Sequence, residues 1–253
     1  MAIWTWAAAS RRGSAHAERG DRRQDAFRIV APASTHDFLV LVACDGAGSA
    51  SHGGEGASLT AWTLTECART WLLDNSCLPE RCDVTLWVQL ARVLIANAAT
   101  ARGLAPADFS TTLVMAISNG ASTLTVHVGD GAVIGRDMVS GTWLSLSWPE
   151  NGEYAATTYF LTDEPEPRLR IALHETAIDR LAVMTDGLER MALNFTSAAP
   201  HAPFFEAMFR PVAASNVAGP NRPLSRQLAA YLDGKQVLAR TDDDKTLILA
   251  ALV

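Results

Sequence analysis

The stretch that decides the fold is CDGAGSA, Cys44–Ala50, which follows the apolar run DFLVLVA at Asp37–Ala43. An apolar run of this length that ends in a glycine-rich turn is typical of a buried strand. A charged residue, Asp45, stands where the strand becomes the turn. The charge has two explanations: the turn holds a phosphate, with Asp45 as a neighbour, or Asp45 itself holds a metal ion.

Composition and charge exclude several classes of protein. The chain has 253 residues, of which 49% are hydrophobic, so it is long enough to bury a substantial core. Its formal net charge is −6 and its pI is about 5.5. These values give no sign of a nucleic-acid interface or a membrane-surface interface.

The cysteines and the start of the chain favour a cytoplasmic protein. No two cysteines form a Cys-x-x-Cys pair or a zinc-site spacing, which favours reduced thiols. The Arg11-Arg12 pair follows the first apolar residues, the wrong order for a secretory or twin-arginine signal. No apolar run approaches the ~20 residues of a membrane helix.

The pattern of short apolar stretches and two longer helical segments predicts an α+β layered fold rather than regular βαβ alternation. Helices are expected over Glu55–Leu73, over Val84–Ala101 and over much of 203–233. Trp62 of the first helix is expected in the core. Residues 148–168 are expected to be a surface excursion. The predicted strands are Ile3–Trp6, Ala26–Val30, Phe38–Ala43, Thr111–Ile117, Ser122–Val128, Ala132–Arg136, Gly141–Leu146, Arg180–Met184 and Lys245–Val253.

Acidic residues recur beside these predicted strands. The positions are Asp25, Asp45-Gly46, Asp130, Asp186-Gly187 and Asp242-Asp243-Asp244. Two carboxylates about 4 Å apart repel by roughly 4 kcal/mol at an effective dielectric near 20. If these strand ends converge, a cation is the natural compensation, and Mg²⁺ and Mn²⁺ prefer oxygen ligands. The alternative is that each aspartate is only a turn or cap residue.

A phosphate-binding turn is the other interpretation of CDGAGSA. Gly46–Ser51 begins as G-x-G-x-x, but Ser51 stands where a dinucleotide site has its third Gly or Ala. The loop also continues through His52-Gly53-Gly54, and the motif G-x-x-x-x-G-K-[ST] is absent. This interpretation is therefore the weaker of the two.

Several motifs in order resemble the metal-dependent protein phosphatases of type 2C, closest to the bacterial branch. They are QDA at 24–26, ACDGAGSA at 43–50, STTL at 110–113, VGDGAVIG at 128–135, GEYAATTYFLT at 152–162, MTDGLE at 184–189 and DDDKTLILA at 242–250. The resemblance spans almost the whole chain, so it implies one domain over 1–253. The implied fold is a four-layer αββα sandwich of two antiparallel sheets flanked by helices.

The resemblance also implies a site for two Mn²⁺ or Mg²⁺ ions and a weaker third ion. By this resemblance Asp45 bridges the two metals, and the Gly46 carbonyl binds one of them. The remaining implied contacts come from Asp186 and Asp243 at the other metal, from Asp25 through water, and from Asp130 at the weaker ion. Asp243 is chosen within the triplet because a polar residue, one further residue and Thr246 follow it.

One position departs from the family pattern. Many members carry a phosphate-binding arginine five residues before the equivalent of Asp25, and that position is Gly20 here. His16 and Arg19 lie nearby and are candidates for substrate binding, with His16 also a candidate general acid. The alternative is that both belong to a solvated basic loop.

The implied activity is hydrolysis of phosphoserine and phosphothreonine by a hydroxide held between the two metals. Asp25, Asp45 and His16 are the catalytic candidates. The expected partner is a phosphorylated protein, in a bacterial signalling system with a Ser/Thr kinase, and neither nucleic acid nor a membrane is expected. Two other functions remain open: a phosphatase-like binding or regulatory protein with little turnover, and a metal-dependent hydrolase of small phosphate esters.

Overall fold

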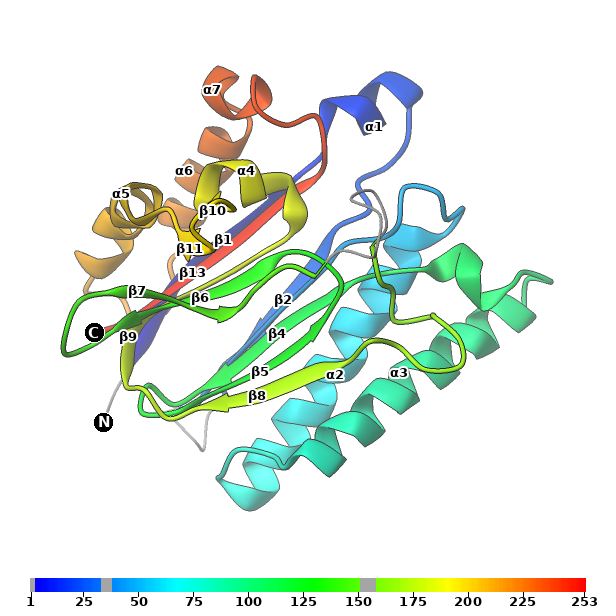
Figure 1. The fold of residues 1–253 in the computed structure, drawn as a ribbon, viewed down its shortest axis with the longest axis horizontal. Helices are drawn as coiled ribbons and strands as arrows, with labels where there is room; N and C mark the ends of the chain where they lie inside the picture. Colours follow the sequence, from blue (N-terminus) through cyan, green and yellow to red (C-terminus); the bar gives the residue numbers. More distant parts are fainter. Residues whose placement is uncertain (1–2, 33–37, 151–157) are drawn as a thin grey trace.

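Two β-sheets packed face to face, with helices over both outer faces, form the computed structural model of the chain (Figure 1). The structure describes residues 3–32, 38–150 and 158–253. Sheet A has the strand order β12-β1-β13-β9-β6-β7, and sheet B has the order β2-β3-β4-β5-β8. Neighbouring strands are antiparallel except for the short β12, which is parallel to β1.

The strand bounds follow the apolar stretches of the sequence. In sheet A they are β12 Gly219–Pro220, β1 Trp4–Arg11, β13 Lys245–Leu252, β9 Ile178–Met184, β6 Ala132–Asp137 and β7 Trp143–Ser147. In sheet B they are β2 Ala26–Val30, β3 Leu39–Cys44, β4 Leu113–Ser118, β5 Thr123–Val128 and β8 Arg170–His174. A further pair joins β10 (Leu193–Asn194) to β11 (Ala199–Pro200).

The strand β3 is apolar throughout because both of its faces are covered. Leu39 and Leu41 point into the layer between the sheets, where they meet residues of sheet A such as Ile248. Val40 and Val42 point outward into the cluster beneath the helices. Successive side chains of a strand alternate between its faces, so a strand in the middle of four layers needs apolar residues at every position.

Two pairs of long helices form the outer layers. α2 (Gly53–Asn75) and α3 (Arg81–Thr100) cover sheet B, and α5 (Ala202–Ala213) and α6 (Arg222–Leu232) cover sheet A. The shorter helices are α1 Ser14–Arg19, η1 Pro106–Phe109, η2 Asp186–Leu188, α4 Glu189–Ala192 and α7 Lys235–Leu238. The order of layers is helix, sheet, sheet, helix, which confirms the predicted αββα sandwich.

Helix α3 has the length and apolarity of a membrane-spanning helix, because its 20 residues include a stretch of 18 with a mean hydropathy of 1.2. The core helix of a globular protein passes the same test. Here Val84, Val88 and Ile95 of α3 are fully buried in the cluster against sheet B. Within the described residues α3 therefore behaves as one layer of the sandwich.

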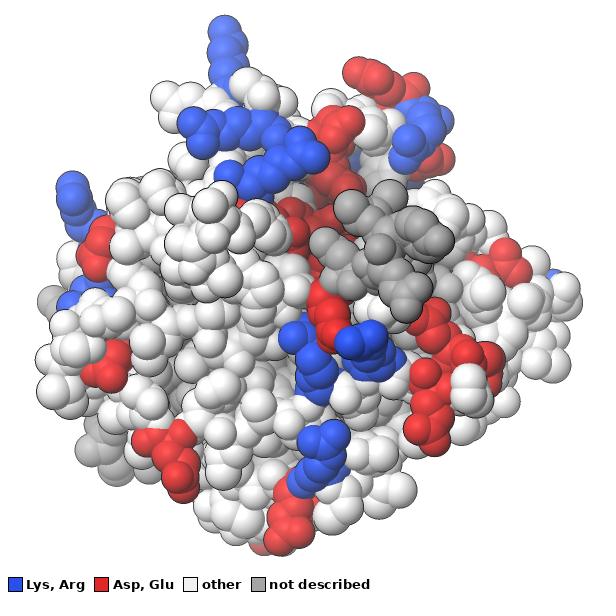
Figure 2. All heavy atoms as spheres, in the orientation of Figure 1, with Lys and Arg blue, Asp and Glu red and all other residues white. Residues whose placement is uncertain are grey.

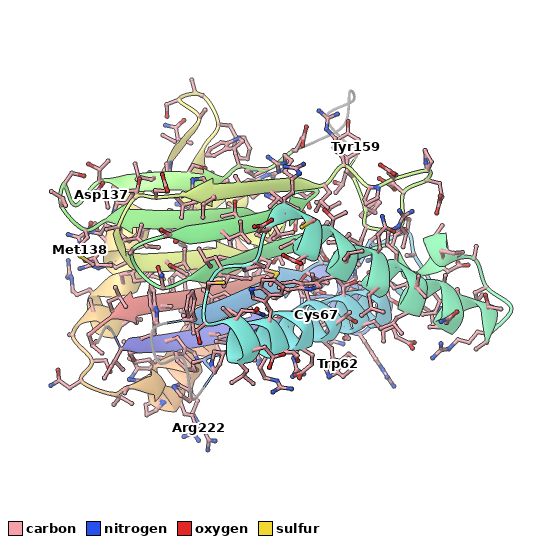
Figure 3. The ribbon with its side chains drawn as sticks, turned by 90° about the horizontal axis from the view of Figure 1, so that it is seen from below. Trp62, Cys67, Asp137, Met138, Tyr159 and Arg222 are labelled. Atoms are coloured by element: carbon pink, nitrogen blue, oxygen red, sulfur yellow. The ribbon has the colours of Figure 1, made fainter. Side chains whose placement is uncertain are left out.

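The structure differs from the sequence-based expectations at four places. β1 extends to Arg11, well beyond the predicted Ile3–Trp6, and both β8 and α1 were missed. Trp62, expected in the core, has 49% of its surface exposed on the outward side of α2 (Figure 3). The predicted surface excursion and the motif at 152–162 fall partly on residues 151–157, which lie outside the described residues.

Candidate metal centre

Strand pairing brings the predicted acidic residues to one end of both sheets. In sheet B, Cys44 pairs with Ala26, so Asp45 and Asp25 lie at adjacent strand ends. In sheet A, Met184 pairs with both Leu247 and Ala132. The turns that carry Asp186, Asp243 and Asp130 follow or precede those paired residues. Figure 2 shows acidic side chains aligned along the middle of one face, with basic side chains on both sides.

Asp25 and Asp45 form the centre of this group. The hydroxyls of Thr185 and Thr246 donate to Asp25 Oδ2 at 2.9 and 2.6 Å. Asp25 Oδ1 is buried and has no hydrogen-bond partner in the described part of the chain. The Asp25 and Asp45 carboxylates lie within hydrogen-bond reach of each other. Two threonines of sheet A thus hold the carboxylate of Asp25, which belongs to sheet B, against Asp45.

Burial, and then the charges of neighbouring aspartates, raise the pKa of both carboxyl groups. Burial raises the pKa of Asp25 to about 6, although the hydroxyl of Thr246 opposes the rise. Burial also raises the pKa of Asp45 well above its usual range, and the charges of Asp25 and Asp186 raise it further. Both effects disfavour the charged form. A cation beside the pair would offset the cost of its buried charge.

The backbone of Asp45 is fixed by the threonines of the STTL motif. The Thr112 amide and the Thr111 hydroxyl donate to the Asp45 carbonyl at 2.8 and 2.9 Å. The Asp45 amide in turn donates to Thr112 Oγ1 at 3.0 Å. The Gly46 carbonyl, predicted to bind a metal, lies 2.7 Å from the side-chain amide nitrogen of Gln24 when that amide is oriented to donate.

A cavity of about 350 Å³ opens beside this pair. Its lining comprises Asp130, Thr158, Asp186, Gly187, Glu189, Arg190, Arg240, Thr241, Asp242 and Asp243, and we call it the acidic cavity. Asp186 Oδ1 is buried without a hydrogen-bond partner among the described residues. Burial, followed by the charges of Asp130 and Asp243, raises the pKa of Asp186 well above its usual range.

The structure separates the members of the Asp242–Asp244 triplet. The Asp244 carboxylate is buried and accepts hydrogen bonds from the backbone amides of Gly13 and Gln24 at 2.6 and 2.5 Å. Asp244 therefore links the segment before β2 to the start of β13 through hydrogen bonds. Asp243 borders the acidic cavity, and its carboxylate accepts only the Asp244 amide, at 2.8 Å, within the described residues. Asp243 is the more available metal ligand.

Glu189 was not singled out from the sequence, although it ends the MTDGLE motif. Its Oε1 accepts the Gly131 amide at 2.7 Å, which ties α4 to the turn that carries Asp130. Burial raises the pKa of Glu189 to about 7. On the other side of the turn, the Thr158 hydroxyl donates to Asp130 Oδ2 at 2.7 Å. Asp130 is thus held at the edge of the acidic cavity by groups from two segments.

A buried histidine, His127, also contacts the turn that carries Asp130. His127 is fully buried, and its Nε2 lies 3.1 Å from the Asp130 carbonyl. Its Nδ1 lies 2.6 Å from Ser147 Oγ and 3.0 Å from Arg170 Nη2. Since Arg170 can only donate, the neutral ring accepts at Nδ1 and donates from Nε2. Burial, and then the charge of Arg170, lower the pKa of His127 to about 3.

This histidine makes stability depend on pH. Unfolding frees His127 to bind a proton below about pH 6.5, whereas the folded state stays neutral down to about 3, so stability is lost as the pH falls through that window. Between pH 7.5 and 5, we expect the unfolding free energy of the wild type to fall by about 2 kcal/mol more than that of His127→Asn. Urea unfolding at both pH values measures this difference, and equal falls in both proteins would contradict it.

His16 and Arg19 do not reach the acidic cavity. His16 is only 4% exposed, and its Nδ1 lies 3.0 Å from Asp244 Oδ1. Arg19 is exposed and pairs with Asp21 at 2.9 Å. The lining of this cavity gives no support to the general-acid and substrate-binding roles expected of these two residues, and both roles stay predictions. Gly20 ends α1 with φ of 77°, a conformation that an arginine at this position would adopt only with strain.

The chemistry of the ligand atoms in this group suits divalent cations. Every charged donor of the group is a carboxylate, and two buried carboxylate oxygens, on Asp25 and Asp186, lack partners among the described residues. In that part of the chain no three Asp, Glu, His or Cys side chains form a closed ligand set. Mg²⁺ and Mn²⁺ can bind without a closed set of protein ligands, because such ions keep several water ligands and bind through one or two carboxylates.

Comparison with known proteins agrees with this architecture. Residues 12–233 match the family described as protein phosphatase 2C. The chain is 35% identical over 255 residues to serine/threonine-protein phosphatase 3 of Escherichia coli strain K12, with 98% of each chain covered.

Two solved structures show the same fold. The PppA protein, described as a key regulatory component of T6SS in Pseudomonas aeruginosa, has a TM-score of 0.69 at 17% identity, with 100% of each chain covered. The catalytic domain of the phosphatase PstP, in complex with two manganese ions, has a TM-score of 0.66 at 19% identity, again with 100% of each chain covered.

Proposed function

Because the chain belongs to the protein phosphatase 2C family, whose members are metal-dependent serine/threonine phosphatases, we propose that it hydrolyses phosphoserine and phosphothreonine in proteins. The observation that carries the proposal is the convergence of Asp25 and Asp45 on each other beside the cavity bordered by Asp186 and Asp243. The proposal extends to one catalytic domain over 1–253, a cytoplasmic location and a substrate phosphorylated by a partner kinase.

Each acidic residue has a distinct place in this proposal. The charges of both Asp25 and Asp186 act on Asp45, so Asp45 would be the carboxylate at the centre of a bound cation pair. Asp186 and Asp243 complete one side, and Asp130 with Glu189 borders the outer part of the cavity. A bound cation pair lowers the pKa of a shared water and neutralises the oxygens of the phosphate.

The protein itself contributes orientation and rigidity. Thr185 and Thr246 fix one oxygen of Asp25, which leaves the other directed at the site. Thr111 and Thr112 hold the backbone of Asp45 at the strand end. Carboxylates held in this way do not need to reorganise during the reaction, which is the main source of electrostatic catalysis.

The basic groups closest to the acidic cavity are Arg190 and Arg240, which border it and are exposed. Within the described residues neither guanidinium has a hydrogen bond or an ion pair. With Gly20 at the usual arginine position, these two are the available partners for the substrate phosphate. Arginine presents a planar fork of donors that suits phosphate oxygens.

We expect Arg190→Ala/Arg240→Ala to raise the KM for a phosphothreonine peptide about tenfold or more, with a smaller change in kcat. The reason is that the pair binds the phosphate in ground and transition states alike. Initial-rate kinetics measure the effect, with Arg226→Ala, an exposed arginine of α6, as the matched control. An unchanged KM in the double variant would remove both arginines from phosphate binding.

The proposed function is tested by hydrolysis of p-nitrophenyl phosphate and of a phosphothreonine peptide with Mn²⁺, Mg²⁺ or EDTA. We expect turnover of both substrates with a divalent cation and none with EDTA. Hydrolysis of a nucleotide but not of the peptide would favour the small phosphate-ester hydrolase. Binding of Mn²⁺ without turnover of any substrate would favour the phosphatase-like binding protein.

A further inference from the structure

A second cavity, of about 740 Å³, lies at the same end of the molecule and has the opposite charge. Its charged lining consists of Arg11, Arg12, Arg22, Arg23 and Asp233, and we call it the arginine cavity. Figure 1 shows α1 and α7, whose residues contribute to its wall, on either side of the end of β1 and the start of β13. Four arginines facing one aspartate are unusual in a chain with a net charge of −6.

Most of the donors in this cavity are free. Arg22 is exposed and makes no hydrogen bond or ion pair within the described residues. Arg12 and Arg23 each use one nitrogen on a backbone carbonyl, those of Asp21 and Ser10, at 3.0 and 3.1 Å. A guanidinium carries five N–H donors, so several remain on each of these side chains. Of the four arginines, Arg11 alone pairs with a carboxylate within the described part of the chain, and that carboxylate belongs to Asp233.

The arginine cavity is separated from the acidic cavity by little more than backbone. Gly13 lines the arginine cavity, and a Cβ on Gly13 would lie 2.3 Å from the Asp242 carbonyl oxygen. Asp242 and Asp243 in turn line the acidic cavity. Ala15 also donates its amide to the Asp242 carbonyl at 3.0 Å. The two cavities therefore lie on opposite sides of one junction, and they share none of their lining residues.

We propose that the arginine cavity binds a second phosphoryl group on the same substrate chain, a few residues from the phosphoserine or phosphothreonine in the acidic cavity. The inference rests on the proposed function and adds a substrate class to it: multiply phosphorylated segments. A phosphoryl group carries a charge of about −1.5 to −2 and three acceptor oxygens, which suits several arginines better than a single carboxylate does. An extended peptide advances about 3.3 Å per residue, so a few residues span adjacent cavities.

The test compares two peptides of one sequence that share a phosphothreonine. The second peptide also carries a non-hydrolysable phosphonate analogue of a phosphorylated residue. A series of such peptides places the analogue two to six residues before or after the phosphothreonine. At the best spacing we expect kcat/KM to rise about tenfold or more, mainly through KM, because charge-assisted hydrogen bonds from arginine are gained. We expect Arg22→Gln/Arg23→Gln to remove this gain and to leave hydrolysis of p-nitrophenyl phosphate unchanged.

The matched control is Arg222→Gln, an exposed arginine at the start of α6 that lines neither cavity (Figure 3). It should keep the full gain. A gain that survives in Arg22→Gln/Arg23→Gln, or the absence of a gain at every spacing, would overturn the inference while leaving the phosphatase intact. Failure of the wild type to hydrolyse even p-nitrophenyl phosphate would instead overturn the proposed function, and the inference would fall with it.

Discussion

Asp45→Asn is expected to lower kcat/KM for a phosphothreonine peptide by about a thousandfold or more. The reason is that the charges of Asp25, Asp186 and Asp243 all act on Asp45, so Asp45 would be the central carboxylate ligand of a bound cation pair. A cation pair contributes several kcal/mol of charge stabilisation and supplies the attacking water, and each 1.36 kcal/mol is a factor of ten in rate. Steady-state kinetics with saturating Mn²⁺ measure the loss.

Unfolding must be excluded as the cause of that loss. Asn has the shape of Asp without its charge, and the raised pKa of Asp45 shows that its charge is unfavourable in the metal-free fold. Metal-free Asp45→Asn should therefore melt at or above the wild-type temperature at pH 7.5. Asp74→Asn, an exposed aspartate of α2, is the control and should keep full activity. A variant that folds normally and retains more than a tenth of wild-type activity would contradict the assignment of Asp45.

Gly46→Ala is expected to lower activity at least about a hundredfold and to destabilise the fold by about 1–3 kcal/mol. A Cβ at Gly46 would lie 2.2 Å from the carbonyl carbon of Gly53, at the start of α2. The contact is between two backbones, so relieving it would shift either the turn that carries Asp45 or the start of α2. Activity assays and thermal unfolding measure the two effects.

The same turn contains its own control. Gly48 would place a Cβ with no neighbour within 4 Å, and its backbone is not in the left-handed region. Gly48→Ala should therefore leave both activity and stability close to those of the wild type. If the two variants behave alike, the turn Asp45–Ser49 is not held against α2 in the way that the structure describes.

The sequence predicted the layers and most of the acidic group for one physical reason. Buried strands are apolar, so a charge directly at a strand end stands out, as Asp45 and Asp186 do. Antiparallel pairing then places such ends together, as it does for Cys44 with Ala26. Strand β8 was not predicted because two of its five residues are exposed and the other three are only partly buried.

Residue roles that depend on three-dimensional partners could not be predicted. The sequence of the Asp242–Asp244 triplet does not show that Asp244 accepts hydrogen bonds from Gly13 and Gln24 whereas Asp243 lines the acidic cavity. His16 looked available because arginines lie on both sides of its segment, yet α1 packs it against Asp244. Trp62 was expected in the core as a large apolar residue of a helical segment, but the buried residues of α2 follow the series Ala57, Ala61, Leu64 and Ala68, which leaves Trp62 exposed.

The central claim is that the group around Asp45 holds divalent cations, and the stoichiometry of Mn²⁺ binding tests it most directly. Titration calorimetry at pH 7.5 on metal-free protein should show at least two ions per wild-type chain and the loss of at least one of them in Asp45→Asn. Wild-type protein that binds no Mn²⁺, or Asp45→Asn that binds as many ions as the wild type with equal affinity, would contradict the claim.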